Sequence, residues 1–164
     1  MNIVKLSIIL LMELILQSTV FQFFNLSGRY PDLLLISLIC FSILLGRKQS
    51  YTLGFIIGLL ADILYGDFIG LYALSFLLTA FITSVISENM FKDSLLAPIS
   101  VFPIGVIINH GSRVLILYLI GNHISIVNYL KFFNLTYWVI NFMALFLIYP
   151  LSLRWVRNNH QSRK

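Results

Sequence analysis

Six apolar runs, separated by short polar or glycine-containing segments, dominate the pattern of this chain and predict six helices. The runs cover residues 6–24, 33–45, 52–65, 68–86, 95–120 and 132–153. A helix that crosses a bilayer needs roughly 20 apolar residues, and most of the runs come near that length. The second run is shorter and reaches only about 20 Å at about 1.5 Å per residue. Neighbouring helices or a locally thinned bilayer are therefore expected to cover it.

The joins between the runs indicate how the helices follow one another. Only Gly66 and Asp67 separate the third and fourth runs, so these two helices are expected to form a tight antiparallel hairpin. The fifth run contains Pro98 and Pro103, which are expected to bend or loosen its first half. The pattern predicts an all-α, polytopic membrane protein with six transmembrane helices.

The composition agrees with a membrane protein and leaves no room for a separate soluble domain. Hydrophobic residues make up 59% of the 164 residues and charged residues only 10%, and the mean hydropathy is +0.94. Soluble domains carry about 25% charged residues. We expect one transmembrane domain over residues 1–153, followed by a basic tail over residues 154–164. The single cysteine, Cys40, excludes an intrachain disulfide.

The distribution of lysine and arginine predicts the orientation in the membrane. With six spans, eight basic residues collect on one side: Lys5, Arg47, Lys48, Lys92, Arg154, Arg157, Arg163 and Lys164. The other side has only Arg29 and Lys131. This bias places both termini in the cytoplasm. The basic residues lack the aromatic interleaving of a nucleic-acid surface, so the net charge of +5 is explained by topology and no nucleic-acid partner is expected.

A row of small residues runs through the third helix and into the fourth. Gly54, Gly58, Asp62, Gly66 and Gly70 stand four residues apart, which places them along one slowly drifting helix face. Small residues on such a face let a second helix approach closely, so the row is a candidate helix-packing surface or partner interface. Gly66 and Gly70 lie at the hairpin turn, and Gly54 and Gly58 are the better packing candidates.

Five residues form a candidate polar network inside the membrane. Asn109, His110 and Arg113 share an arc of about 100° on the fifth helix. We hypothesise that Asp62 pairs with Arg113 and that Glu13 approaches His110. Such groups mark ion or proton pathways or hold helices together. The structural role is favoured here because neither paired carboxylates nor a repeated relay spacing is present.

The sequence offers little support for an enzyme. It has no glycine-rich phosphate loop, no two histidines at metal-binding spacing and no serine in a nucleophile elbow. A lipid-processing enzyme would need a groove with clustered acids, which the sequence also lacks. We therefore expect no catalytic residue, no cofactor and no metal.

Residues 29–80 resemble the rod shape-determining protein MreD family. Arg29-Tyr30-Pro31-Asp32 is similar to the entry into the family's second span, and Arg47-Lys48 to its short basic turn. The glycine row, with Leu71 and Ala73, is similar to the family's most recognisable signature. The rest of the chain resembles the family in length and hydropathy. The family's fold is similar to the substrate-binding subunits of energy-coupling factor transporters.

The resemblance implies a non-enzymatic component of the bacterial cell-elongation machinery in the cytoplasmic (inner) membrane. Its implied partner is MreC, within a complex with MreB, RodA and an elongation transpeptidase, and it would support lateral peptidoglycan synthesis and cell shape. The alternative is the membrane subunit of a vitamin-type transporter that binds a small molecule. That alternative predicts an outward-facing cavity lined by Asp62, Arg113 and aromatic side chains such as Tyr72 or Tyr118.

Overall fold

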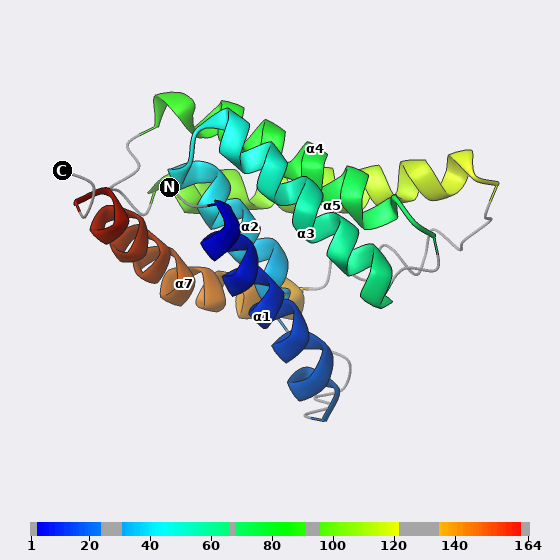
Figure 1. Cartoon of the computed structure of the whole chain (residues 1–164). Coiled ribbons are helices and arrows are strands. Elements are labelled where there is room, and N and C mark those ends of the chain that lie inside the picture. Colours follow the sequence, from blue (N-terminus) through cyan, green and yellow to red (C-terminus); the bar gives the residue numbers. More distant parts are fainter. Residues whose placement is uncertain (1–2, 24–30, 66–67, 91–95, 122–134, 162–164) are drawn as a thin grey trace.

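The structure, a computed structural model, describes residues 3–23, 31–65, 68–90, 96–121 and 135–161. Six α-helices and no strand occur within these residues (Figure 1). The helices are α1 (Ile3–Phe23), α2 (Leu33–Leu44), α3 (Arg47–Tyr65), α4 (Leu71–Ile86), α5 (Leu96–Leu119) and α7 (Leu135–Gln161), with a short 3₁₀ helix η1 (Ser87–Asn89) after α4. Each of the six apolar runs therefore contains a helix, as predicted.

Several helix boundaries differ from those expected, and three of them change the picture of the bundle. α3 begins at Arg47, because the carbonyl of Gly46 accepts hydrogen bonds from the amides of Gln49 and Ser50 and starts the helix early. α4 begins only at Leu71, after a left-handed glycine. α7 continues to Gln161, so much of the expected basic tail is helical.

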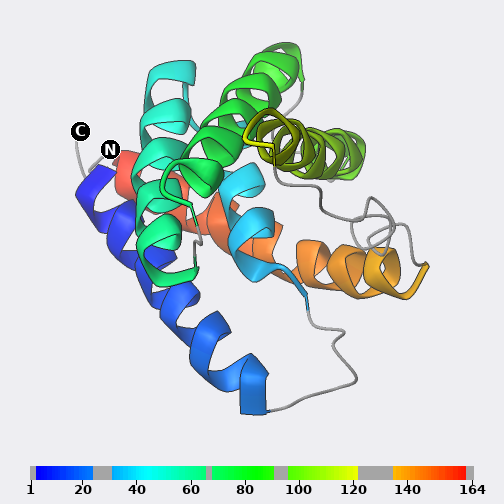
Figure 2. The same ribbon diagram turned by 90° about the vertical axis from the view of Figure 1, so that its right-hand side faces the viewer.

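The second helix is the centre of the bundle. α2 contacts α1, α3, α4, α5 and α7, and every residue from 34 to 43 is buried. Figure 2 shows α2, in light blue, surrounded by the other helices. A helix that is hydrophobic on all sides is stable when neighbours cover it completely. Its 12 residues can thus be fewer than a lipid-facing span requires, because protein covers them instead of lipid.

Large apolar side chains also cover the outside of the bundle. Those on α1, α5 and α7 include Ile8, Met12, Ile107, Leu115, Val139, Met143, Leu147 and Leu151. Soluble monomers rarely expose apolar surface on this scale. Two helices, Leu96–Leu119 and Leu135–Arg157, are long and apolar enough to cross a membrane. The fold is therefore that of a membrane protein.

The interior carries small hydroxyl side chains among its apolar ones. On α4 the hydroxyls of Ser75, Thr79 and Thr83 each donate to the carbonyl four residues earlier, at 2.6–2.7 Å. These bonds satisfy the hydroxyls inside their own helix. The compact side chains then let neighbouring helices pack closely in a setting where no water is available.

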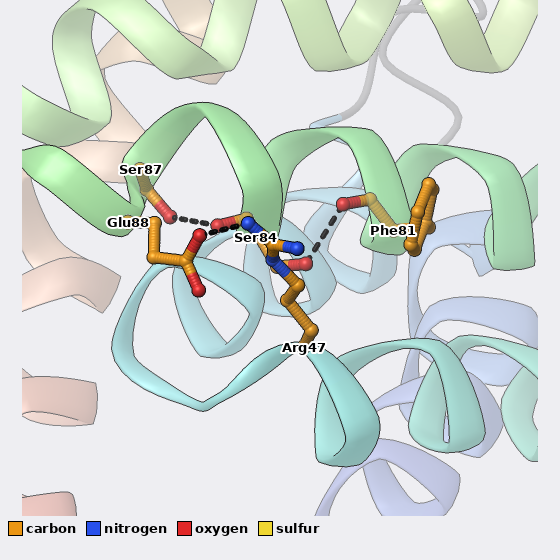
Figure 3. Close-up of polar contacts among 5 residues, drawn as sticks. All are labelled: Arg47, Phe81, Ser84, Ser87 and Glu88. Atoms are coloured by element: carbon orange, nitrogen blue, oxygen red, sulfur yellow. Dashed lines mark hydrogen bonds and ion pairs between the residues drawn. The ribbon is translucent and has the colours of Figure 1, made fainter.

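The start of α3 and the end of α4 are joined at the surface. Figure 3 shows the Arg47 guanidinium paired with the carboxylate of Glu88 in η1, beside the hydroxyls of Ser84 and Ser87. Both charged side chains are about half exposed, at 52% and 49%. A pair exposed to this degree contributes at most about 1 kcal/mol. At the opposite end of the α3–α4 pair, the buried Asp62 side chain joins the two helices.

Candidate functional site

The Asp62 carboxylate lies at the N-terminus of α4 and accepts three backbone hydrogen bonds there. One oxygen accepts from the amides of Gly70 (2.9 Å) and Ala73 (3.1 Å), and the other from Tyr72 (2.7 Å). The side chain is only 2% exposed. The first amides of a helix lack partners within the helix, and its N-terminus carries a partial positive charge. A carboxylate from α3 therefore caps the next helix of the hairpin.

The ion pair expected between Asp62 and Arg113 is not formed. In the described part of the chain, the Asp62 oxygens are directed to the α4 backbone, while Arg113 on α5 lies over two aromatic rings of α4. Its guanidinium carbon is 4.5 Å from the ring centroid of Tyr72 and 5.5 Å from that of Phe76. Cation–π contacts of this kind contribute about 0.5–2 kcal/mol. The backbone of the adjacent helix, and not Arg113, thus provides the hydrogen bonds to the Asp62 carboxylate.

The glycine row is the contact between α3 and α4. A Cβ atom added at Gly58 would lie 2.4 Å from the Cα atom of Ala73, and one added at Gly54 would lie 2.6 Å from the Phe76 carbonyl oxygen. Both positions thus allow the two backbones to approach closely within one chain. The surface that these glycines offer is filled by α4.

The other two glycines of the row belong to the turn. Gly70 has a φ of +106°, a left-handed conformation that side chains disfavour, and it precedes the first residue of α4. Gly66 lies outside the described residues. Gly70 therefore allows the chain to turn into α4, which agrees with its expected position at the hairpin turn.

The remaining candidates of the polar network lie on different neighbours. The Asn109 amide donates to the Thr79 hydroxyl at 3.4 Å. The His110 ring centroid is 6.1 Å from that of Tyr137 on α7. Glu13 faces α2 near Ser37, and α1 packs chiefly against α2 and α3. Among the residues that the structure describes, no hydrogen bond or ion pair joins Glu13 to His110.

A second group of polar side chains caps the N-terminus of α2. Asp32 accepts from the amide of Leu35 at 3.2 Å, and Gln17 on α1 accepts from the amide of Leu34 at 3.1 Å. Asn141 on α7 accepts from the Asp32 amide at 2.9 Å. Side chains from two neighbouring helices thus hold the start of the central helix. Each of the two carboxylates, Asp32 and Asp62, is tied to a helix N-terminus.

This arrangement is suited to holding helices together. Across residues 3–23, 31–65, 68–90, 96–121 and 135–161, no group of three histidine, cysteine, aspartate or glutamate side chains is placed to hold a metal ion. Asp62 and Tyr118 also do not face one shared cavity, because Asp62 is directed to the α4 backbone and Tyr118 is 74% exposed. The geometry favours a packing role for these acids.

Comparison with known protein families matches residues 1–158 of the chain to the family described as rod shape-determining protein MreD. The chain belongs to the MreD family. The match covers nearly the whole sequence and extends well beyond residues 29–80, in which the resemblance is visible by eye. MreD membership gives the chain a role in determining rod shape, as a shape-determining component. No curated protein and no solved structure matches it significantly.

Two sets of structural residues in this MreD-family chain were not predicted from its sequence. The α2 cap was signalled by Pro31-Asp32 directly before an apolar run, a usual N-terminal pattern, but its long-range partner Asn141 had no such signal. The four-residue spacing of Ser75, Thr79 and Thr83 was visible in the sequence. It indicates one polar face on α4 that points into the bundle.

Replacing Asn141 by alanine is expected to lower the free energy of unfolding by about 2 kcal/mol, because the partly buried Asp32 amide loses its acceptor and the fully buried Asn141 side chain is removed. Ser152→Ala on the same helix is the matched control. The Ser152 hydroxyl bonds only to the Ile148 carbonyl at 2.9 Å, so its loss should cost less than about 1 kcal/mol. Denaturant titration of both purified variants measures the difference. Equal stabilities would contradict the role of Asn141 at α2.

Proposed function

We propose that this chain is a non-enzymatic scaffold of the rod-shape machinery, which binds a transmembrane partner and supports lateral peptidoglycan synthesis. The observation that carries the proposal is the family match over residues 1–158. The packing agrees with it, since the buried carboxylate of Asp62 and the capping carboxylate of Asp32 are both used to join helices. A scaffold needs a rigid bundle more than it needs reactive groups.

The proposed setting is the cytoplasmic membrane of a bacterium, crossed six times, with both termini in the cytoplasm. The distribution of eight basic residues against two supports this orientation. Arg47 and Glu88, near the expected cytoplasmic loops, form their exposed ion pair at the end of the hairpin where a polar surface is needed. The N-termini of α2 and α4 would then face the extracytoplasmic side.

The proposed partner is MreC, within a complex that includes MreB, RodA and an elongation transpeptidase. Since α4 fills the surface of Gly54 and Gly58, the partner helix is proposed to pack on an outward-facing apolar surface. Gly111 on α5 is exposed, and a Cβ atom added there would meet nothing within 4 Å. Its neighbour Ile107 is 54% exposed. Small residues of this kind let a second helix approach closely.

Depletion of the protein in its native cell tests the role. If that cell is a rod, depletion is expected to make it round, and the wild-type gene should restore the rod. Continued rod growth after full depletion would remove the proposal. Co-purification of MreC with the detergent-solubilised chain tests the partner.

Two leucine variants separate folding from partner binding. Gly58→Leu should lose both stability and MreC, because the added side chain meets the α4 backbone. Gly111→Leu points into open space and should keep the stability of the wild type. Loss of MreC from stable Gly111→Leu would place the partner on α5. Full MreC recovery with Gly111→Leu would exclude that face.

A further inference from the structure

The Arg113 guanidinium is a charge without a counter-ion in the described part of the bundle. No described carboxylate lies within ion-pair distance of it, because Asp62 and Asp32 are bound to the starts of α4 and α2. The residue is partly exposed, and its aromatic contacts with Tyr72 and Phe76 leave the charge itself unneutralised. A lone charge at membrane depth marks a functional site unless it is paired.

Two hydrogen-bond donors close to this charge also lack partners. The Arg113 Nε atom and the Tyr137 hydroxyl are both buried without a hydrogen bond. His110 lies between them, one turn before Arg113 on α5 and 6.1 Å from the Tyr137 ring, and Arg113 lies within electrostatic range of both. Buried donors normally have partners. The Asp32 carboxylate also lies within electrostatic range of His110 and Tyr137, so the anion site centres on the Arg113 guanidinium, and the Tyr137 hydroxyl is a second, neutral donor.

The position of Arg113 indicates which anion can reach it. α5 runs antiparallel to α4, since Gly105 lies beside Thr83, Asn109 beside Thr79 and Arg113 beside Tyr72. Arg113 therefore lies at the same end of the bundle as the capped N-termini of α2 and α4. Leu115, two residues further along α5 and 59% exposed, lies on the opposite, outward-facing side of this helix. The ligand thus meets a cation at one end of a bundle whose outer surface is apolar.

We propose that Arg113, together with Tyr137, binds the phosphate group of an anionic membrane lipid. A guanidinium presents planar donors that match phosphate oxygens, and the Tyr137 hydroxyl supplies a further donor. The lipid chains would lie against the exposed apolar side chains of α5. This site goes beyond the scaffold role. Because Leu115 lies on the same face of α5 as Ile107 and Gly111, a partner helix packed there would cover part of the apolar surface, so lipid retention is measured on the chain purified without MreC.

Native mass spectrometry of the full chain tests the proposal, with phosphatidylglycerol and zwitterionic phosphatidylcholine offered in equal amounts. The wild type should retain phosphatidylglycerol preferentially. Arg113→Gln should lower that retention about tenfold, the usual effect of losing one charge-assisted hydrogen bond. Tyr137→Phe, which keeps the ring, should lower it about threefold, a smaller loss expected for a neutral donor. The control Arg47→Gln removes an arginine at the other end of the bundle and should change nothing.

Each remaining outcome would contradict either the existence of the site or the assignment of its ligand to a lipid. Equal phosphatidylglycerol retention by Arg113→Gln and Arg47→Gln would overturn the proposal, as would a parallel loss of both lipids. A further arm adds inorganic phosphate. Displacement of the lipid by phosphate at equal concentration would make the free anion the ligand and overturn the lipid. If Arg113→Gln does not fold, an unchanged lipid preference in Tyr137→Phe overturns the site. If the wild type retains a bound protein chain and no lipid, and Arg113→Gln loses that chain, the lipid proposal is also overturned.

Discussion

Replacing Asp62 by alanine is expected to lower the free energy of unfolding by about 4 kcal/mol, a loss well above that of an average substitution. The change leaves the amides of Gly70, Tyr72 and Ala73 without an acceptor at a site that is buried at Ala73 and partly buried at the other two. Each buried, unpaired donor costs about 1–3 kcal/mol, and relaxation of the turn offsets part of the sum. The favourable charge at the start of α4 is lost as well.

The single cysteine offers a direct measurement of this effect. Cys40 is 0% exposed, so a thiol-reactive fluorescent dye will label it only when the bundle opens. The midpoint of thermal labelling in detergent should fall by about 10 °C in Asp62→Ala, given a shift of about 2–4 °C per kcal/mol at this chain length. Asp62→Asn keeps one oxygen acceptor and should fall between this variant and the wild type.

Glu88→Ala is the matched control for Asp62→Ala. Glu88 is also a carboxylate on the same hairpin, but its side chain is about half exposed and pairs with Arg47 at the surface. Its loss should cost less than about 1 kcal/mol. Similar midpoints for Asp62→Ala and Glu88→Ala would show that the α4 cap does not stabilise the fold.

The position of Asp62 was predictable from the sequence, but its partner was not. The four-residue spacing placed Asp62 on the same face as Gly54 and Gly58, and all three do face α4. The prediction then assigned the carboxylate to a side chain of opposite charge. In a tight hairpin the free amides of the following helix are closer, and they lie only eight to eleven residues away in the chain. Backbone groups at helix ends are therefore partners that a search for charged pairs overlooks.

For α2, too, the position in the bundle was predictable from the sequence, whereas its distant hydrogen-bond partner was not. The short length of α2 predicted either coverage by neighbouring helices or a locally thinned bilayer, and the burial of residues 34–43 supports the first of these. The Asp32–Asn141 hydrogen bond, however, joins residues 109 positions apart. No local pattern specifies such a contact, because it depends on how α7 crosses α2. The helices follow from local sequence, whereas the contacts between distant helices follow from their packing.

Adding one methyl group at Gly58 is expected to separate α3 from α4 and to lower the free energy of unfolding by about 3 kcal/mol. In Gly58→Ala the new Cβ atom would lie 2.4 Å from the Ala73 Cα atom and 2.7 Å from the Tyr72 carbonyl oxygen. Both atoms are backbone, so no side chain can rotate away, and overpacking of this kind is destabilising. The Ala73 amide also bonds to Asp62, so the shift weakens the α4 cap as well.

Gly111→Ala is the control for Gly58→Ala, because it adds the same methyl group inside a helix where nothing lies within 4 Å. Alanine is favoured over glycine in a helix by up to about 1 kcal/mol, so this variant should be as stable as the wild type or slightly more so. The two identical substitutions should therefore differ in the Cys40 labelling midpoint, which falls in Gly58→Ala and stays at or slightly above the wild-type value in Gly111→Ala. A stabilised Gly58→Ala would mean that α3 and α4 can move apart freely, and the glycine row would then serve a purpose other than their close packing.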